Sequence, residues 1–77
     1  MAHRRPVKRS LTLRGHRTSV SLEDVFWDAF RNIAEAEGQT INGLAAKIDE
    51  ARGDLGLASA IRIYVLEHTL AQNQSSA

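Results

Sequence analysis

The chain has 77 residues, of which 43% are hydrophobic, and its formal net charge is +1. This length allows a single domain with a small core, a size at which association between copies often adds stability. The absence of cysteine excludes disulfides and thiolate metal sites. No apolar run approaches the roughly 20 residues of a membrane-spanning helix, and the basic N-terminus lacks the apolar stretch of a secretory signal. We therefore expect a cytoplasmic protein.

Charge is distributed unevenly along the chain. Residues 1–17 hold six Arg and Lys side chains and no acid, whereas residues 18–77 hold four basic and nine acidic side chains. Residues 1–9 show no hydrophobic period and are interrupted by Pro6, which predicts a disordered basic arm. Such an arm suits a polyanion and often becomes ordered only when nucleic acid binds.

Polar and apolar residues alternate over residues 17–22, which predicts a β-strand. One face of this strand carries Thr18, Val20 and Leu22. The other face carries Arg17, Ser19 and Ser21. A lone strand of this length leaves both edges unpaired and is not stable in water, so we expect it to pair. The simplest partner is the same strand of a second copy.

A shorter alternation precedes this strand, with Leu11 and Leu13 apolar. These positions are odd-numbered, whereas the apolar positions of residues 17–22 are even-numbered, so one uninterrupted strand cannot bury both sets. The parity changes near residues 14–16, where Gly15 can adopt a positive φ. Two alternatives stay open at this point: a hairpin that places an additional strand beside the main one, or a β-bulge.

The remainder of the chain is predicted to be helical. A 3.6-residue apolar period indicates helices over residues 23–37, 41–52 and 57–71, followed by a polar tail over residues 72–77. Gly38 suits the position after a helix C-terminus, and Thr40 suits the N-cap of the next helix.

The third predicted helix has two apolar sides. One consists of Leu57, Ile61, Tyr64 and Val65, and the other of Ile63, Leu66 and Leu70. The positions predicted to be exposed are Arg62, Glu67 and Thr69. A surface helix of a monomer buries only one apolar face. We therefore expect this helix to lie between subunits, and its second face is a possible contact for a protein partner.

Signals for catalysis are absent from the sequence. The histidines His3, His16 and His68 lack metal-ligand spacing, and there is no nucleophile motif, paired carboxylate or phosphate-binding glycine loop. His68 falls on an apolar stripe, where a hydrogen-bonded interface histidine is the expected role. The chain is therefore predicted not to be an enzyme, and to need no metal or other cofactor.

The polar face of the predicted strand suits contact with DNA bases. Arg17 can bind guanine O6 and N7 bidentately, and the hydroxyls of Ser19 and Ser21 can donate to or accept from either base of a pair. The alternative is that these are ordinary outward-facing residues of an antiparallel sheet, and the pattern alone does not decide between the two.

Other groups suit contact with phosphate. The start of the second predicted helix presents free backbone N–H groups and the positive end of its dipole, at Thr40, Ile41 and Asn42. Basic side chains in and before the strand are further candidates for phosphate contact: Arg4, Arg5, Lys8, Arg9 and Arg14.

The order of strand, helix, glycine, Ser/Thr cap and second helix over residues 17–52 resembles the ribbon-helix-helix superfamily of dimeric bacterial DNA-binding proteins, of the Arc, MetJ and CopG kind. The stretch G-Q-T-I-N at residues 38–42 is similar to the turn between the two helices in that superfamily. Over residues 8–70, R-G-H-R-T-S-V-S-L-E followed by F-W, and later S-A-I-R-I-Y-V-L-E-H, resembles a group of short bacterial ribbon-helix-helix proteins.

This resemblance implies a mainly α fold with a short β ribbon, in an intertwined homodimer whose paired strands lie antiparallel in the major groove of double-stranded DNA. The base-reading positions fall on Arg17, Ser19 and Ser21, and the phosphate anchor on the amides of residues 40–42. The additional C-terminal helix and the segment at residues 10–14 depart from the minimal form.

We therefore expect residues 10–71 to form a ribbon-helix-helix domain of a sequence-specific DNA-binding protein. Its expected role is that of a nucleoid-associated transcriptional repressor or autoregulator. Two alternatives are an antitoxin of a toxin–antitoxin pair and a helical dimer that serves as an adaptor and does not bind DNA.

Overall fold

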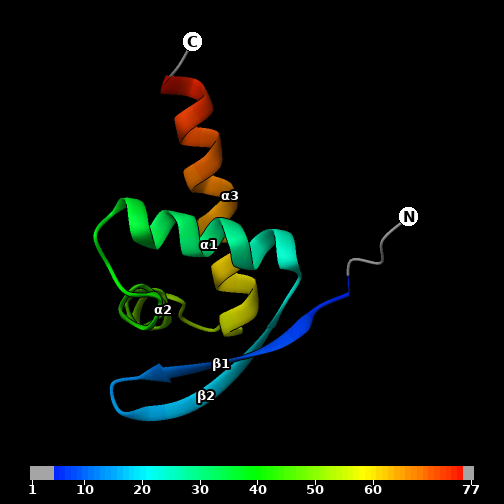
Figure 1. Ribbon diagram of the computed structural model, residues 1–77, viewed down its shortest axis with the longest axis vertical. Coiled ribbons are helices and arrows are strands. Elements are labelled where there is room, and N and C mark those ends of the chain that lie inside the picture. The colour runs from blue at the N-terminus through cyan, green and yellow to red at the C-terminus, as the bar shows by residue number, and fades with distance from the viewer. Residues whose placement is uncertain (1–4, 76–77) are drawn as a thin grey trace.

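The structure is a computed structural model that describes residues 5–75, and it contains a two-stranded sheet followed by three helices (Figure 1). The strands are β1 (Val7–Leu13) and β2 (His16–Leu22). The helices are α1 (Asp24–Ala36), α2 (Ile41–Ala51) and α3 (Leu57–Ser75). This confirms the predicted mainly α fold, with a short β ribbon and an additional C-terminal helix.

β1 and β2 form an antiparallel hairpin, which decides between the two alternatives left open by the sequence. Arg14 and Gly15 have φ values of 53° and 81°, and two successive positive φ values are the mark of a type I′ turn. The register pairs Leu13 with His16, so only two residues connect the strands. Because the chain reverses across an even number of residues, odd positions of β1 and even positions of β2 share one face.

The basic arm predicted over residues 1–9 is too long, because β1 begins at Val7. Residues 7–9 show no apolar period of their own. They are ordered by their ladder with residues 20–22, a pairing between distant segments that a local pattern does not reveal. Arg4 and the rest of the arm's first four residues lie outside the described residues. At the other end, α3 runs to Ser75, so much of the predicted polar tail is helical.

The core lies between the inner face of the hairpin and one face of each helix. Its largest fully buried side chains are Leu22, Phe30, Leu44 and Ile61, one from β2 and one from each helix. Leu11 and Val20 contribute from the two strands. The predicted inward positions Val20 and Leu22 are therefore buried, whereas Thr18, on the same face nearer the turn, is exposed.

The predicted helix ends at the α1–α2 junction are confirmed. Gly38 has a φ of 69°, its N–H donates to Glu35 O at 3.0 Å, and Gln39 N–H donates to Ala34 O at 2.9 Å. This pair of bonds is a Schellman motif. Thr40 Oγ1 then accepts from Gly43 N at 2.9 Å and caps α2. The sharp turn places the first turn of α2 against β1.

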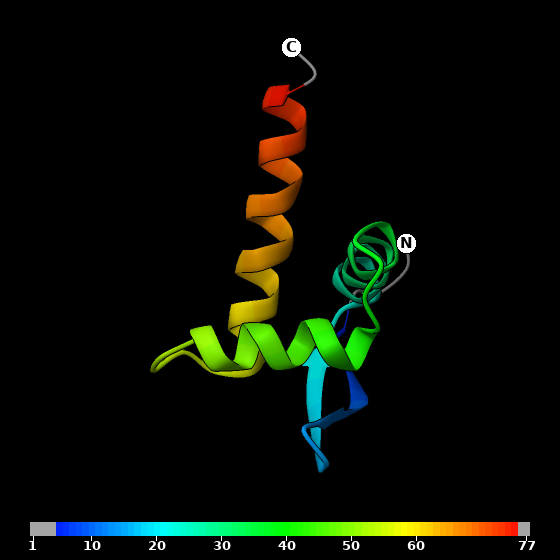
Figure 2. The same ribbon diagram turned by 90° about the vertical axis from the view of Figure 1, so that its left-hand side faces the viewer.

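The hairpin and the C-terminal half of α3 lie at opposite ends of the molecule, with α2 between them (Figures 1 and 2). One apolar side of α3 packs on the core through Ile61 and Val65. The other side, made of Ile63, Leu66 and Leu70, is 44–55% exposed in the single chain. The two apolar sides predicted for this helix are therefore present, and one of them is uncovered.

Candidate nucleic-acid interface

The hairpin has an outer face that points away from the helices. Cross-strand partners in an antiparallel sheet project to the same side, so the register assigns six residues to this face. The outer face consists of Lys8, Ser10 and Thr12 from β1, and of Arg17, Ser19 and Ser21 from β2. All six are exposed. They include two cations, four hydroxyl groups and no acid, so every side chain can donate a hydrogen bond to DNA.

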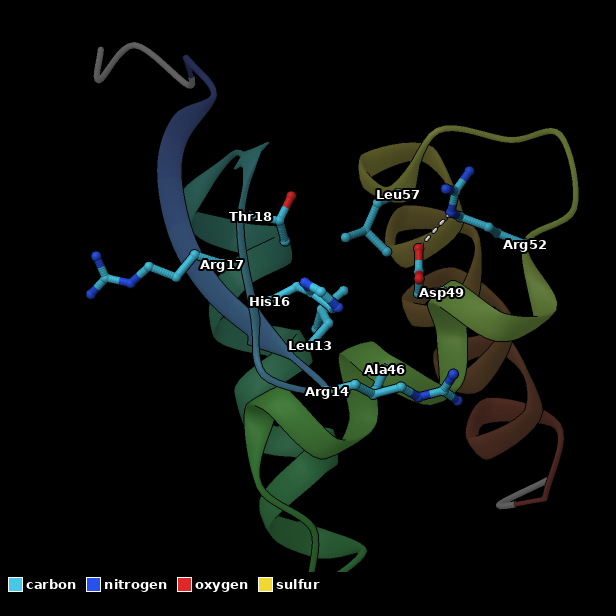
Figure 3. A pocket seen from close by; sticks show the side chains of 9 residues that line it. All are labelled: Leu13, Arg14, His16, Arg17, Thr18, Ala46, Asp49, Arg52 and Leu57. Carbon is cyan, nitrogen blue, oxygen red and sulfur yellow. Dashed lines mark hydrogen bonds and ion pairs between the residues drawn. The ribbon is translucent and has the colours of Figure 1, made fainter.

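The three predicted base-reading residues thus lie together on the exposed face of β2. Figure 3 shows Arg17 directed away from the helices, on the side of the hairpin opposite to Leu13, His16 and Thr18. Lys8 shares the same face, directly across from Ser21. Ser10 and Thr12 belong to it as well, although the sequence interpretation did not select them. Their signal was the alternation at residues 10–13, which becomes readable only once the turn at residues 14–15 is known.

Arg9, predicted to contact phosphate, lies on the inner face instead. Its guanidinium sits 5.3 Å from the centre of the Trp27 ring and forms an ion pair with Asp24. The side chain is 20% exposed. Position 9 pairs with Val20, an inward residue, so the parity of the strand turns Arg9 towards α1. Arg9 therefore links β1 to α1, and we do not assign it to the interface.

Arg14 projects from the hairpin turn beside a groove of about 580 Å³ (Figure 3). It forms an exposed ion pair with Glu50 of α2. Across the groove, Arg52 Nε donates to Asp49 Oδ1 at 2.6 Å, so this cation of α2 is compensated by a neighbouring carboxylate. An exposed ion pair contributes only about 0–1 kcal/mol, so Glu50 does not prevent Arg14 from exchanging to another anion.

The start of α2 lies beside β1. Asn42 Oδ1 accepts a hydrogen bond of 3.0 Å from the backbone N–H of Thr12. The Thr40 hydroxyl satisfies Gly43 N, whereas in the described chain the amides of Ile41 and Asn42 have no hydrogen-bond acceptor. The first N–H groups of a helix point out along its axis and carry its positive dipole end. The structure thus places two free amides next to the edge of the hairpin.

The hydrogen bond from Thr12 to Asn42 also shows which cross-strand pairs of the hairpin are hydrogen-bonded to each other and which are not. Thr12 directs its N–H away from β2, so Thr12–Arg17 is a non-hydrogen-bonded pair, and such pairs recur at every second position. The N–H and C=O groups of Arg17, Ser19 and Ser21 therefore point to the far edge of β2. In the described part of the chain, no hydrogen bond engages those of Arg17 or Ser19. β2 consequently has an open edge.

Arg62 of α3 closes one end of that open edge. Its Nη2 donates to Ser21 O at 3.2 Å and its Nε to Glu23 Oε1 at 3.0 Å. The pKa of Glu23 lies below its ordinary value, first because of a hydrogen bond from its own backbone amide; desolvation opposes this, and Arg62 lowers the pKa further. The prediction that Arg62 is plainly exposed is wrong, since it is half-buried between the end of β2 and the start of α1.

Two residues discussed in the sequence analysis, Arg5 and His68, do not form a catalytic or metal-binding site in the structure. Arg5 is exposed just before β1. His68 Nε2 lies 3.4 Å from Glu37 Oε2, to which Tyr64 Oη also donates, so this histidine links α3 to the end of α1. No cluster of three potential metal ligands occurs within residues 5–75. None of the helices described is long and apolar enough to cross a membrane.

Comparison with known proteins agrees with this geometry. A family model described as a ribbon-helix-helix domain matches residues 6–69. Among solved structures, an uncharacterized protein from Bordetella pertussis Tohama I superposes with a TM-score of 0.78 at 30% sequence identity. The alignment covers 94% of this chain and 62% of that one, so the chain spans less than two thirds of that protein. The search of curated proteins gave no significant match.

The family match covers both strands, α1, α2 and most of α3. The chain therefore belongs to the ribbon-helix-helix domain family, whose members are in general DNA-binding regulators.

Proposed function

We propose that this protein is a homodimeric, sequence-specific DNA-binding regulator that acts on the nucleoid as a repressor or autoregulator. Two β2 strands pair through their open edges and enter the major groove. Arg17, Ser19 and Ser21 of each copy then face the base edges. The observation that carries the proposal is the conjunction of an open strand edge with an exposed, acid-free row of side chains on the same strand.

The edges of the hairpin favour β2 as the pairing strand. An unpaired edge is a template for another strand, and proteins usually cover or pair such edges. Asn42 occupies part of the β1 edge, whereas the β2 edge keeps the backbone groups of Arg17 and Ser19 free. Antiparallel pairing of β2 with its copy, centred on Ser19, satisfies both residues. It places Arg17 opposite Ser21 of the partner subunit, whose carbonyl oxygen can accept a second hydrogen bond beside the one from Arg62. The outer faces of the two hairpins then form one continuous polar surface.

Uncovered apolar side chains also favour a dimer. Val25 of α1 is 52% exposed, and the apolar stripe Ile63, Leu66 and Leu70 lies along α3. Each fully buried aliphatic side chain of this size contributes about 1.5–3 kcal/mol. A chain of this length buries only a limited apolar surface area by itself, and a second copy that covers these residues adds to the buried area. We assign this stripe to the subunit interface rather than to an unrelated protein partner.

Phosphate contacts complete the proposed complex. The free amides of Ile41 and Asn42 at the α2 N-terminus suit one phosphate oxygen, in a position that Thr40 holds by capping the helix. Lys8, Arg14 and Arg5 add positive charge around the ribbon. Contacts of this kind fix the position of the protein on the duplex, whereas sequence is read by the groove-facing residues.

The test starts by selecting bound duplexes from a random DNA library, because the operator sequence is unknown. Mobility-shift titrations then compare wild type with Arg17→Ala on the selected site and on its single-base variants. We expect Arg17→Ala to lose about 1–3 kcal/mol of discrimination at one base pair of each half-site. Arg31→Ala, which removes the same charge from an exposed position on α1, is the matched control.

Two results contradict the proposal. If wild-type protein binds no duplex at 50 mM salt, the protein is not a DNA-binding regulator. If Arg17→Ala and Arg31→Ala discriminate among all operator variants as wild type does, Arg17 does not read a base.

A further inference from the structure

We propose that β1 is a second DNA-contacting strand, whose Lys8, Ser10 and Thr12 side chains lie on the sugar–phosphate walls of the groove that β2 reads. This inference rests on the proposed function, because it requires two β2 strands to pair in the major groove. It adds a role for Ser10 and Thr12, and it separates the outer face into a base-reading strand and a backbone-gripping strand.

The dimensions of the sheet lead to this division. Pairing of two β2 strands gives the strand order β1-β2-β2-β1, with neighbouring strands about 4.7–4.9 Å apart. Three such spacings put the two β1 strands about 14 Å from one another. The major groove of B-DNA is about 12 Å wide and admits a two-stranded ribbon. The two central strands fit between the phosphate rows, and each β1 strand lies over a row.

The side chains of β1 match that position chemically. Lys8 carries an ammonium group, and Ser10 and Thr12 carry short hydroxyl groups directly across from Ser19 and Arg17. Ammonium and hydroxyl groups both donate to phosphate oxygens, and no carboxylate lies on this face to repel them. A short hydroxyl side chain also lets the strand approach the backbone closely.

β1 is held rigidly in place rather than free to fold away. Leu11 is 3% exposed and anchors its centre in the core. Arg9 is held against Trp27 and Asp24, and the Thr12 amide is bound by Asn42. The last of these bonds also brings Thr12 beside the free amides at the start of α2. The β1 side chains and the α2 amides can therefore grip the same phosphate row without further ordering of the chain.

Salt dependence separates a backbone contact from a base contact. Each neutralised phosphate changes the slope of log K against log salt by about 0.9. A dimer has two copies of Lys8, so we expect Lys8→Ala to reduce the magnitude of the slope by about 1.8, with no change in the preferred sequence. Ser10→Asp places a negative charge on the same strand and should weaken binding to all duplexes alike. Lys47→Ala, at a site on α2 away from the hairpin's outer face, should leave the slope unchanged.

The experiment distinguishes failure of this inference from failure of the proposed function. If Arg17→Ala relaxes base preference while Lys8→Ala and Ser10→Asp behave like Lys47→Ala, then β1 makes no backbone contact and only the present inference fails. If Lys8→Ala changes the preferred base, β1 enters the groove and the inference is also wrong. Absence of any DNA binding at 50 mM salt overturns both. Thermal unfolding of each variant confirms that the ribbon is intact.

Discussion

At the scale of single residues, the hairpin turn shows a conflict between local geometry and residue choice. Arg14 occupies the first central position of a type I′ turn with a φ of 53°, where Asn, Asp and Gly are favoured. A side chain with a Cβ in this left-handed region costs about 1–2 kcal/mol relative to the right-handed one. The proposed phosphate contact would account for an arginine at this strained position.

We therefore predict that Arg14→Asn stabilises the protein by about 1 kcal/mol and weakens DNA binding. Asn tolerates the left-handed conformation because its short amide bonds locally, whereas the loss of the exposed ion pair with Glu50 costs little. Urea denaturation measures the first effect and a mobility-shift titration the second. Arg14→Val should instead destabilise the fold, because a branched Cβ is least tolerated at positive φ. Equal stability of the three proteins would show that the turn is not strained.

At the scale of secondary-structure elements, one side chain joins β2, α1 and α3. Arg62 reaches from α3 to the Ser21 carbonyl and the Glu23 carboxylate, and its guanidinium lies 5.8 Å from the centre of the Phe26 ring. These contacts fix the end of the base-reading strand relative to the C-terminal helix. The orientation of the ribbon therefore depends on α3, which the minimal strand–helix–helix arrangement lacks.

The lowered pKa of Glu23 makes this junction sensitive to acid. A group whose folded pKa is depressed stabilises the fold above its unfolded pKa, here taken as 4.5, and loses that contribution as pH falls through the folded value. We predict that Glu23→Gln is less stable than wild type at pH 7, and that the difference shrinks as the pH is lowered below about 4.5. Chemical denaturation at pH 7, 5 and 3.5 tests this.

Glu35→Gln serves as the control, since this carboxyl is exposed on α1 and outside the junction. A constant difference between wild type and Glu23→Gln at all three pH values would mean that ionisation of Glu23 does not stabilise the junction.

At the scale of the whole molecule, the uncovered side of α3 bears on assembly. Leu66 is 55% exposed and lies at the centre of the apolar stripe formed with Ile63 and Leu70. Scattered exposed apolar residues are ordinary, but a continuous stripe on a projecting helix marks an interface. The same stripe could also hold together a dimer that acts as an adaptor. A protein that is dimeric in solution but gives no mobility shift with any DNA would support that alternative.

We predict that Leu66→Glu raises the dimer Kd at least about 100-fold. The residue occurs twice in a dimer, and each lost burial costs about 2 kcal/mol before the desolvation of the carboxylate is counted. Sedimentation equilibrium measures the change. Thr69→Glu adds the same charge to the same helix beside the stripe and should leave the mass at two chains. A Leu66→Glu protein that remains dimeric at the same concentration would exclude this stripe from the interface.

Features that depend on neighbouring residues could be predicted from the amino-acid order alone. Local patterns predicted the three helices, the glycine and threonine at the α1–α2 junction, and the polar row of Arg17, Ser19 and Ser21. They could do so because backbone preferences act within a few positions. The change of parity around Gly15 located the reversal, although not its type.

Contacts between side chains far apart in the sequence could be identified only in the folded chain. Arg9 meets Asp24 across 15 positions and Arg62 meets Glu23 across 39. Arg9 was predicted to contact phosphate and Arg62 to be exposed, and neither ion pair was predicted. The extension of β1 to Val7 and the open edge of β2 likewise follow from strand pairing. Such contacts gain their energy from burial and pairing between segments, and a local sequence pattern does not encode which segments lie close in space.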